Sequence, residues 1–302
     1  MLFDEPAVSL FPAVRSREAP HRSAPGAPPG VIGRHTVRMT SRRGTARPQE
    51  TRQQTIVEYV VERGSATANE LAELAGVSVM TVHRDVDDLA RRGLLRKFRG
   101  GVSAQPSSVF ESDVEYRLGA RLAQKQAIAQ CATALVEPGT SLLLDDSTTA
   151  LQLARRLDRF TPLTVVTNYR RAMDELCGVT DLRLIALGGE YSRTHDSFNG
   201  LSCTEAIARV HVDVAFVSTS AMTTDMTFHQ EQEIVQVKRA MLASASKRVL
   251  LMDSGKLTRT ALHQLAPLAE YDDLVVDDGA DPELLTELRE AVRVHVAETD
   301  PS

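Results

Sequence analysis

The sequence predicts an α/β protein in which a small helical module with a β-ribbon precedes a larger domain built on a mainly parallel sheet. The first observation is that apolar residues recur at helical spacing in three short segments between residues 49 and 93. The second is that short apolar runs beyond residue 140 alternate with helical segments, which is typical of a parallel sheet covered on both faces. The 302 residues, 42% of them hydrophobic, suffice for two domains with a sizeable core.

Charge is distributed unevenly along the chain. The net charge is −5, yet residues 1–103 contain 16 Lys and Arg against 11 Asp and Glu, so the remainder is strongly acidic. A basic N-terminal part on an acidic body suits a module that binds a polyanion. No apolar run is long enough for a membrane-spanning helix, so we expect a cytoplasmic protein with no membrane partner. The three cysteines match no metal-ligand spacing, and we expect no metal and no cofactor.

Four segments divide the chain. Residues 1–47 are rich in Pro, Arg, Ala, Ser and Gly and lack periodicity, which predicts a disordered N-terminal extension. Residues 48–103 contain the helical module and its ribbon. Residues 104–114 are typical of a linker, and residues 115–295 contain the α/β domain.

The N-terminal module has the element order of a winged helix-turn-helix. A first helix runs from Gln49 to Arg63, and a second, short helix ends at Gly76. Ser78 is a suitable N-cap for a third helix, and residues 94–102 form the ribbon. We expect four apolar residues of the third helix to face the core, namely Val79, Val82, Val86 and Leu89.

Such a unit binds double-stranded DNA. Its third helix, which is the second helix of the helix-turn-helix pair, lies in the major groove, and its wing lies on phosphates or the minor groove. The candidate DNA-binding residues are Ser78, Thr81, His83, Arg84, Arg96, Lys97 and Arg99. Three acidic residues further along the helix should point away from DNA or pair with Arg91 and Arg92, namely Asp85, Asp87 and Asp88. The alternative is a three-helix element whose arginines serve only solubility.

The larger domain is predicted from its alternating segments. Strands are expected at residues 142–144, 163–166, 182–187, 212–217, 249–252 and 274–276. A long helix is expected from residue 115 to about residue 135, and further helices at 151–157, 170–177, 204–210 and 231–245.

Small, hydroxyl-bearing or charged residues follow most of these strands. Ligands of parallel α/β sheets bind at the carboxyl ends of the strands. Residues 147–149 open a helix and offer N–H and hydroxyl groups to an anion, while Asp145 or Asp253 could bind sugar hydroxyls. The candidate effector-binding residues are Asp145, Ser147, Thr148, Thr149, Thr167, Asn168, Gly188, Gly189, Lys238, Asp253 and Lys256. The plainer interpretation of each is a helix cap, a turn or a solvated lysine.

The stretch from Glu70 to Gly101 resembles the N-terminal signature of the DeoR family of bacterial regulators. The matching residues are Val77, Ser78, Thr81, Arg84, Asp85, Leu89, Gly93, Gly100 and Gly101. The chain departs at His83, where the family usually has Arg, and at Arg99, where it usually has His. The family's operator sequence therefore cannot be transferred to this chain.

The resemblance continues through the larger domain. The matching residues are Lys125, Asp145, Thr148-Thr149, Thr167-Asn168, Gly188-Gly189, Lys238-Arg239, Met241, Asp253 and Lys256. The resemblance implies a fold like that of sugar-phosphate isomerases, with a phosphorylated sugar as effector. Ser147 stands where the family has Gly, and residues 218–222 lack its usual glycines, so the rim of the pocket is expected to differ.

We therefore expect a homo-oligomeric repressor without catalytic residues. One alternative is a sugar-phosphate isomerase-like enzyme that uses Asp145, Asp146 or Glu231 as its base. A second is a phosphorylation receiver, which we disfavour because Gly188-Gly189 is expected to end the middle strand, where an Asp is needed. A third is an interaction protein that binds DNA without a ligand.

Overall fold

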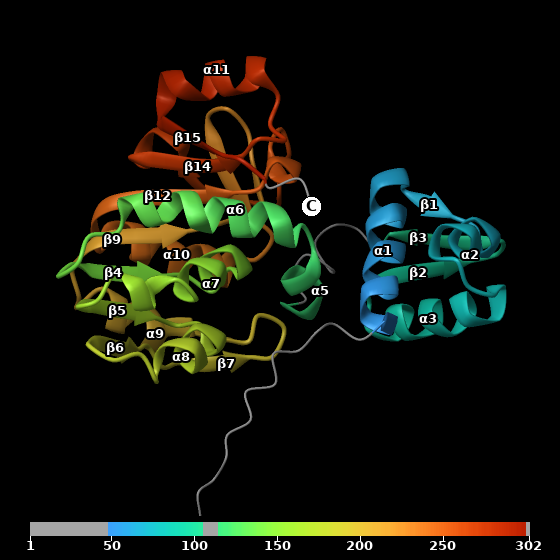
Figure 1. Ribbon diagram of the computed structural model, residues 1–302, viewed down its shortest axis with the longest axis horizontal. Coiled ribbons are helices and arrows are strands. Elements are labelled where there is room, and N and C mark those ends of the chain that lie inside the picture. Colours follow the sequence, from blue (N-terminus) through green and yellow to red (C-terminus); the bar gives the residue numbers. More distant parts are fainter. Residues whose placement is uncertain (1–47, 105–113, 300–302) are drawn as a thin grey trace, which may run out of the picture. The chain divides into compact units, whose positions relative to one another are not determined.

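A computed structural model describes residues 48–104 and 114–299, in two parts that are taken one at a time below (Figure 1). The expected disordered extension, residues 1–47, lies outside the described residues. So does the expected linker apart from its end residues, Ala104 and Val114. Within the two described ranges, no helix has the length and apolar character that crossing a membrane requires.

The N-terminal part is a three-helix unit with a small antiparallel sheet. Its elements are α1 (Pro48–Arg63), β1 (Ser65–Ala66), α2 (Ala68–Ala75), α3 (Val79–Arg91), β2 (Leu95–Phe98) and β3 (Gly101–Ala104). The sheet order is β1-β3-β2, and only the two-residue strand β1 was not predicted. One apolar core joins the helices to the hairpin through Ile56, Val60, Leu71, Val82, Leu89 and Leu95. These elements form the predicted winged helix-turn-helix.

Side-chain caps set the turn between α2 and α3. Thr67 and Glu70 form a reciprocal capping box at the start of α2. Gly76 ends α2 with φ +62°, a conformation that favours glycine. Ser78 caps α3 as predicted, because its hydroxyl oxygen accepts a hydrogen bond from the Thr81 N–H. The prediction for Val79 was wrong: it is 38% exposed, since the buried cluster begins one turn later on α3, at Val82.

The larger part contains a seven-stranded sheet in the order β15-β14-β12-β9-β4-β5-β6, and every adjacent pair is parallel. Its strands are β4 (Ser141–Leu144), β5 (Leu163–Thr167), β6 (Leu182–Ala186), β9 (Val212–Val217), β12 (Ala245–Met252), β14 (Asp273–Asp277) and β15 (Arg293–Ala297). The first six match the predicted strands. Strand β15 was missed because charged and polar side chains alternate with its valines.

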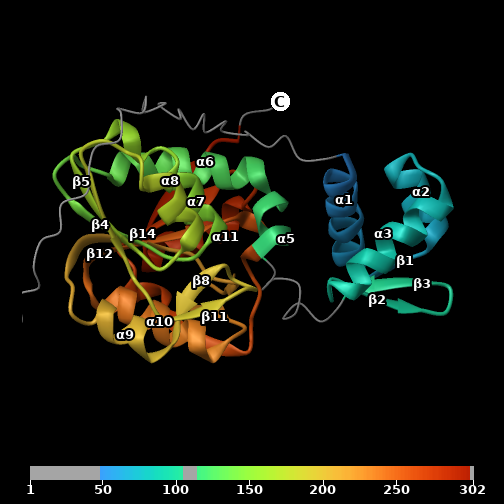
Figure 2. The same cartoon turned by 90° about the horizontal axis from the view of Figure 1, so that it is seen from below.

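Helices cover both faces of this sheet, as the strand–helix alternation predicted (Figures 1 and 2). They are α5 (Val114–Gly119), α6 (Leu122–Ala132), α7 (Thr148–Ala154), α8 (Arg170–Leu176), α9 (Gly200–Ile207), α10 (Gln232–Ala243) and α11 (Pro282–Ala291). Helices α6, α7 and α8 share one apolar cluster with the sheet. Helices α9, α10 and α11 share the other, so the sheet is buried between two helical layers.

Short elements complete this part. Single 3-10 turns are η1 (Thr133–Leu135), η2 (Leu157–Arg159), η3 (Ser254–Lys256) and η4 (Leu268–Glu270). Two small antiparallel sheets pair β7 (Glu190–Ser192) with β8 (Ser197–Asn199), and order β10 (Ala221–Met222), β11 (Met226–His229) and β13 (His263–Pro267) consecutively. None of these strands was predicted.

The long helix expected over residues 115–135 is broken. Helix α5 ends at Gly119 and α6 begins at Leu122, with Arg121 between them in the left-handed conformation at φ +50°. The guanidinium of Arg121 lies 2.9 Å from a carboxylate oxygen of Asp253 and 3.9 Å from one of Asp277. These ion pairs tie the break to the carboxyl ends of β12 and β14.

Candidate functional site

The N-terminal part presents an exposed surface on the first two turns of α3. Met80 is 64% exposed, and His83 and Arg84 are also exposed. Within the described ranges, Arg84 forms no ion pair, so its guanidinium remains available to an external acceptor. The hydroxyl groups of the predicted residues Ser78 and Thr81 form a hydrogen bond with each other, and their oxygens are 3.0 Å apart.

The acidic residues of α3 orient the helix. Asp85 is 1% exposed, and its carboxylate accepts hydrogen bonds from Arg52 at 2.7 Å and Gln53 at 3.2 Å. This contact joins α3 to α1 from the side opposite the exposed surface. Arg91 and Arg92 were the partners expected for the acidic residues. Both pair with Asp88, Arg91 at 2.9 Å and Arg92 at 3.9 Å.

The wing carries the second set of predicted DNA contacts. Arg96 and Arg99 are exposed, and neither forms an ion pair with a described residue. Lys97 differs because its ammonium group donates to Asp87 of α3, and this hydrogen bond lowers the pKa of the Asp87 carboxyl. The structure thus leaves two of the three wing cations fully available for phosphates.

The larger part contains a cavity of about 770 Å³ at the carboxyl ends of the central strands. Its wall is built from the α5–α6 break, the turns after β4, β9 and β12, the end of β11, and α10. Cations gather on one side of it, namely Arg117, Arg121, Lys125, Lys256 and Arg259. The walls therefore suit an anion larger than a single small ion.

Two of these cations are unusually short of partners. Lys125 is 4% exposed and donates a hydrogen bond to the backbone carbonyl of Arg117. Burial, followed by repulsion from Lys256, lowers the pKa of Lys125 to about 7, although Asp253 opposes this shift. The buried Nε of Arg117 has no hydrogen-bond partner. No described residue forms an ion pair with either side chain, so an anion in the cavity would meet both.

The predicted anion turn, residues 147–149, lies on the cavity wall, but local contacts use much of its capacity. The Ser147 hydroxyl oxygen caps α7 by accepting from the Ala150 N–H, and the Ser147 N–H donates to Asp145. The Thr148 hydroxyl donates to the Arg117 carbonyl at 3.1 Å. The plainer interpretation, a helix cap, therefore holds for Ser147.

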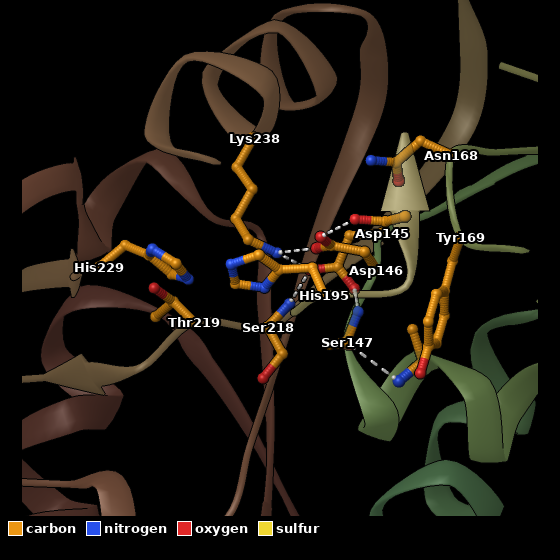
Figure 3. A network of polar contacts seen from close by, with 12 residues as sticks. Asp145, Asp146, Ser147, Asn168, Tyr169, His195, Ser218, Thr219, His229 and Lys238 are labelled. Atoms are coloured by element: carbon orange, nitrogen blue, oxygen red, sulfur yellow. Dashed lines mark hydrogen bonds and ion pairs between the residues drawn. The ribbon is translucent and has the colours of Figure 1, made fainter. Parts of the chain in front are cut away.

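Asp145, Asp146 and Lys238 form a buried ionic network beside the cavity (Figure 3). Asp145 is fully buried and does not line the cavity; its carboxylate accepts from Lys238 and from the N–H groups of Ser147 and Ser218. We expected Asp145 to bind sugar hydroxyls, but in the structure its oxygens accept hydrogen bonds from the chain itself. Lys238 likewise pairs with both carboxylates, so it supplies little charge to a ligand.

Two histidines complete the wall on the side of this network (Figure 3). His195 lies between Arg117 and Glu231, with its Nδ1 3.3 Å from a guanidinium nitrogen and its Nε2 2.9 Å from the carboxylate. His229 lies at the end of β11, and its Nδ1 accepts from the Glu231 N–H at 3.1 Å. Burial, then the charge of Lys238, lowers the pKa of His229 to about 3, so this imidazole is neutral.

The cavity unites some of the predicted effector residues and excludes others. Those on its wall are Ser147, Thr148, Thr149, Lys238, Asp253 and Lys256. Those outside its wall are Asp145, Thr167, Asn168, Gly188 and Gly189. The sheet order explains the division, because β4, β9 and β12 are adjacent whereas β5 and the edge strand β6 lie to one side. The premise that Gly188-Gly189 ends the middle strand was therefore wrong.

Several wall residues were not among the predicted site residues. They are Arg117, Arg121, Asp146, His195, His229 and Arg259. Arg117 and Lys125 lie on α5 and α6, on the two sides of the break at Arg121, so helical spacing gave no signal that they meet. The two histidines had no signal in the sequence either, because short strands and a hairpin loop position them.

Comparison with known families identifies the class of protein. A model of the DeoR-like helix-turn-helix domain matches residues 52–108, and a model of the DeoR C terminal sensor domain matches residues 120–278. A winged helix-turn-helix followed by such a sensor domain defines a DNA-binding transcriptional regulator. The chain belongs to the DeoR family.

Relatives at moderate identity match this chain over most of both lengths. A putative aga operon transcriptional repressor of Escherichia coli O157:H7 is 28% identical over 80% of this chain and 90% of its own. An L-fucose operon activator of Haemophilus influenzae is 30% identical over 75% of this chain and 91% of its own. Among solved structures, ribose 5-phosphate isomerase A of Methanocaldococcus jannaschii is similar with a TM-score of 0.33 and 19% identity, over 44% of this chain and 53% of that one.

Proposed function

We propose that the chain is a repressor that binds an operator through α3 and the β2–β3 wing, and that a phosphorylated sugar in the cavity alters this affinity. The DNA contacts are those of the sequence prediction, led by Arg84 on α3 and by Arg96 and Arg99 on the wing. Repression requires only that the bound protein block transcription. The chain acts by binding and not by turnover, in line with the regulators to which it is similar.

The observation that carries the effector proposal is the pair Arg117 and Lys125. Lys125 is buried and has no ion pair among the described residues, which costs free energy, and an anion that completes the site recovers it; Arg117 is half-buried and lies beside it. A phosphate group supplies two negative charges and several acceptor oxygens. Each charge-assisted hydrogen bond contributes about 1.5 to 3 kcal/mol. Lys256, with its ammonium group 3.8 Å from Asp253, adds a third cation to the same wall.

The rest of the cavity suits the sugar. Its volume of about 770 Å³ is larger than a phosphate alone needs. Asp146 and the two histidines offer hydrogen-bonding groups, and His229 is uncharged. A ligand with an anionic end and a hydroxylated end matches both sides of the cavity.

Calorimetry with pairs of ligands tests this proposal. Sugar phosphates, the same sugars without phosphate, and inorganic phosphate are titrated into the full chain. The phosphorylated member of the best pair should bind at least ~100-fold more tightly, as two charge-assisted bonds require. Equal affinity within every pair, or binding of none of these compounds, contradicts the proposal.

A matched pair of variants assigns the site. Lys125→Met removes a cation from the cavity, whereas Arg183→Met removes an exposed one from β6, outside the cavity wall. The first should abolish measurable binding of the sugar phosphate and the second should leave it unchanged. The same loss in both would show that net charge, and not the cavity, determines binding.

We further propose that the regulator acts as a homo-oligomer, because two winged helices on two half-sites multiply weak contacts into specific affinity. Footprints should then show two half-sites separated by about one helical turn or a multiple of it. A single protected half-site at saturation would contradict this.

A further inference from the structure

The cavity has two chemically different sides. Lys125 and Lys256 line one part of its wall, and Arg117 reaches from Lys125 to His195. In the other part lie Asp146, which pairs with Lys238, and the uncharged His229 (Figure 3). A ligand with an anionic end therefore has one favourable orientation, with its uncharged end toward Asp146 and His229.

The tautomer of His229 follows from its one hydrogen bond. The Nδ1 atom accepts from the backbone N–H of Glu231, which can only donate. A neutral imidazole that accepts at Nδ1 carries its proton on Nε2. Among the described residues, nothing accepts a hydrogen bond from this Nε2–H. His229 thus offers the cavity one fixed donor, and its lowered pKa, about 3, keeps it uncharged.

Asp146 supplies the complementary acceptor. One carboxylate oxygen accepts from Lys238 at 3.2 Å and the other from the Ser197 hydroxyl at 2.8 Å. Each oxygen can accept more than one hydrogen bond, so capacity remains toward the cavity. Although burial favours the neutral acid, the charges of Lys238, His195 and Arg117 hold the pKa of Asp146 well below its usual range. The carboxylate is therefore ionised and fixed in orientation.

We propose that His229 and Asp146 form a donor–acceptor pair that selects the effector by its hydroxyl groups. This inference rests on the proposed function and names the residues that determine specificity within the same cavity. A hydroxyl both donates and accepts. It can accept from the His229 N–H and donate to the Asp146 carboxylate only when the ligand places it at one position in the cavity. A ligand without that hydroxyl leaves the His229 Nε2–H without an acceptor and Asp146 with one donor fewer, which is the situation that gives strong discrimination.

Monodeoxy analogues test the pair. Ribose 5-phosphate, glucose 6-phosphate and fructose 6-phosphate are titrated with their available monodeoxy and epimeric counterparts, and with inorganic phosphate. For the wild-type chain, the best sugar phosphate should bind on the order of 100-fold more tightly than at least one such counterpart. In His229→Phe this ratio should fall to about threefold or less, while the affinity for inorganic phosphate stays within about twofold.

Two further variants keep the result interpretable. His229→Gln places an amide N–H near the position of Nε2 and should restore most of the discrimination. His211→Phe removes an exposed histidine from the same part of the chain and should change nothing.

The possible outcomes separate this inference from the proposed function. An unchanged ratio in His229→Phe overturns the inference alone, as does wild-type binding without discrimination. Loss of inorganic phosphate binding in His229→Phe also overturns it, since His229 would then be structural. If the wild-type chain binds no phosphorylated compound, the proposed function fails together with the inference.

Discussion

At the scale of single residues, Lys125 shows why the cavity is expected to bind an anion. Its side chain is buried, its only hydrogen bond in the described ranges is to a backbone carbonyl, and its pKa falls to about 7. Arg117, Arg121 and Lys256 surround it with positive charge, and only Asp253 opposes them. The folded chain thus holds a lysine whose charged form is favoured mainly when an anion is present.

This lysine predicts proton uptake on effector binding. Near pH 8 most of Lys125 is neutral in the free protein, and a bound phosphate raises its pKa, so binding takes up as much as one proton. The phosphate itself contributes little there, because its second pKa is about 6. Affinity for the sugar phosphate should fall as the pH rises above about 7, by as much as about tenfold per unit. Calorimetry in two buffers of different ionisation enthalpy measures the uptake; zero uptake at pH 8 in the wild-type chain contradicts the role of Lys125.

The same residue predicts a gain in stability on mutation. The pKa of Lys125 is lower in the folded chain than in the unfolded chain, so the unfolded chain binds more protons between about pH 7 and 10.5. Stability therefore rises with pH across this window, and the penalty is fully present below it. Lys125→Met should stabilise the ligand-free protein at pH 7 by about 1 to 4 kcal/mol. Thermal unfolding measures this, and a lower melting temperature would show that Lys125 supports the fold.

Arg84 makes the corresponding prediction for DNA. It is exposed on α3 and has no ion pair within the described residues. Arg84→Ala should weaken specific operator binding by about 1 to 3 kcal/mol. Arg91→Ala is the control, because Arg91 lies two turns further along α3 and pairs with Asp88. If footprinting gives the same operator affinity for Arg84→Ala and wild type, α3 is not the recognition helix.

At the scale of elements, the position of α3 depends on the buried pair of Arg52 and Asp85. Asp85→Ala leaves the Arg52 guanidinium, 20% exposed, without its acceptor and should cost about 2 to 3 kcal/mol in the free energy of unfolding of the winged helix-turn-helix. Asp87→Ala breaks only the exposed contact with Lys97 and should cost less than about 1 kcal/mol. Denaturant unfolding followed by circular dichroism compares the two; equal losses would show that the buried pair is not an anchor.

Elements were predictable from the sequence where local chemistry determines them. Ser78 caps a helix through its hydroxyl and Gly76 ends one because it lacks a side chain, and six strands are apolar enough to be recognised. Strand β15 alternates polar and apolar residues, so its position at the sheet edge was not evident. The break at Arg121 depends on Asp253 and Asp277, more than 130 residues away, and no local pattern indicated it.

At the scale of the whole molecule, the sheet order decides which predicted residues meet. Four strand ends carried candidate residues, but only β4 and β12, which lie on the two sides of β9, bring theirs to one cavity. Asp145 and Lys238 were predicted to bind the effector, but in the structure they pair with each other. Arg117, His195 and His229 reach the wall from the short helix α5, the β7–β8 turn and the short strand β11, which sequence periodicity did not reveal.

The central claim is that a phosphorylated sugar in this cavity controls DNA binding by a separate part of the chain. Operator DNA selected from a random pool allows affinity to be measured with and without the best sugar phosphate, for wild type, Lys256→Met and the control Arg183→Met. We expect the sugar phosphate to weaken wild-type and Arg183→Met binding at least ~10-fold, a coupling of about 1.4 kcal/mol. Lys256→Met should bind the operator as tightly as wild type and should not respond. A response in Lys256→Met as large as in wild type, or no response in the wild type itself, would contradict the account.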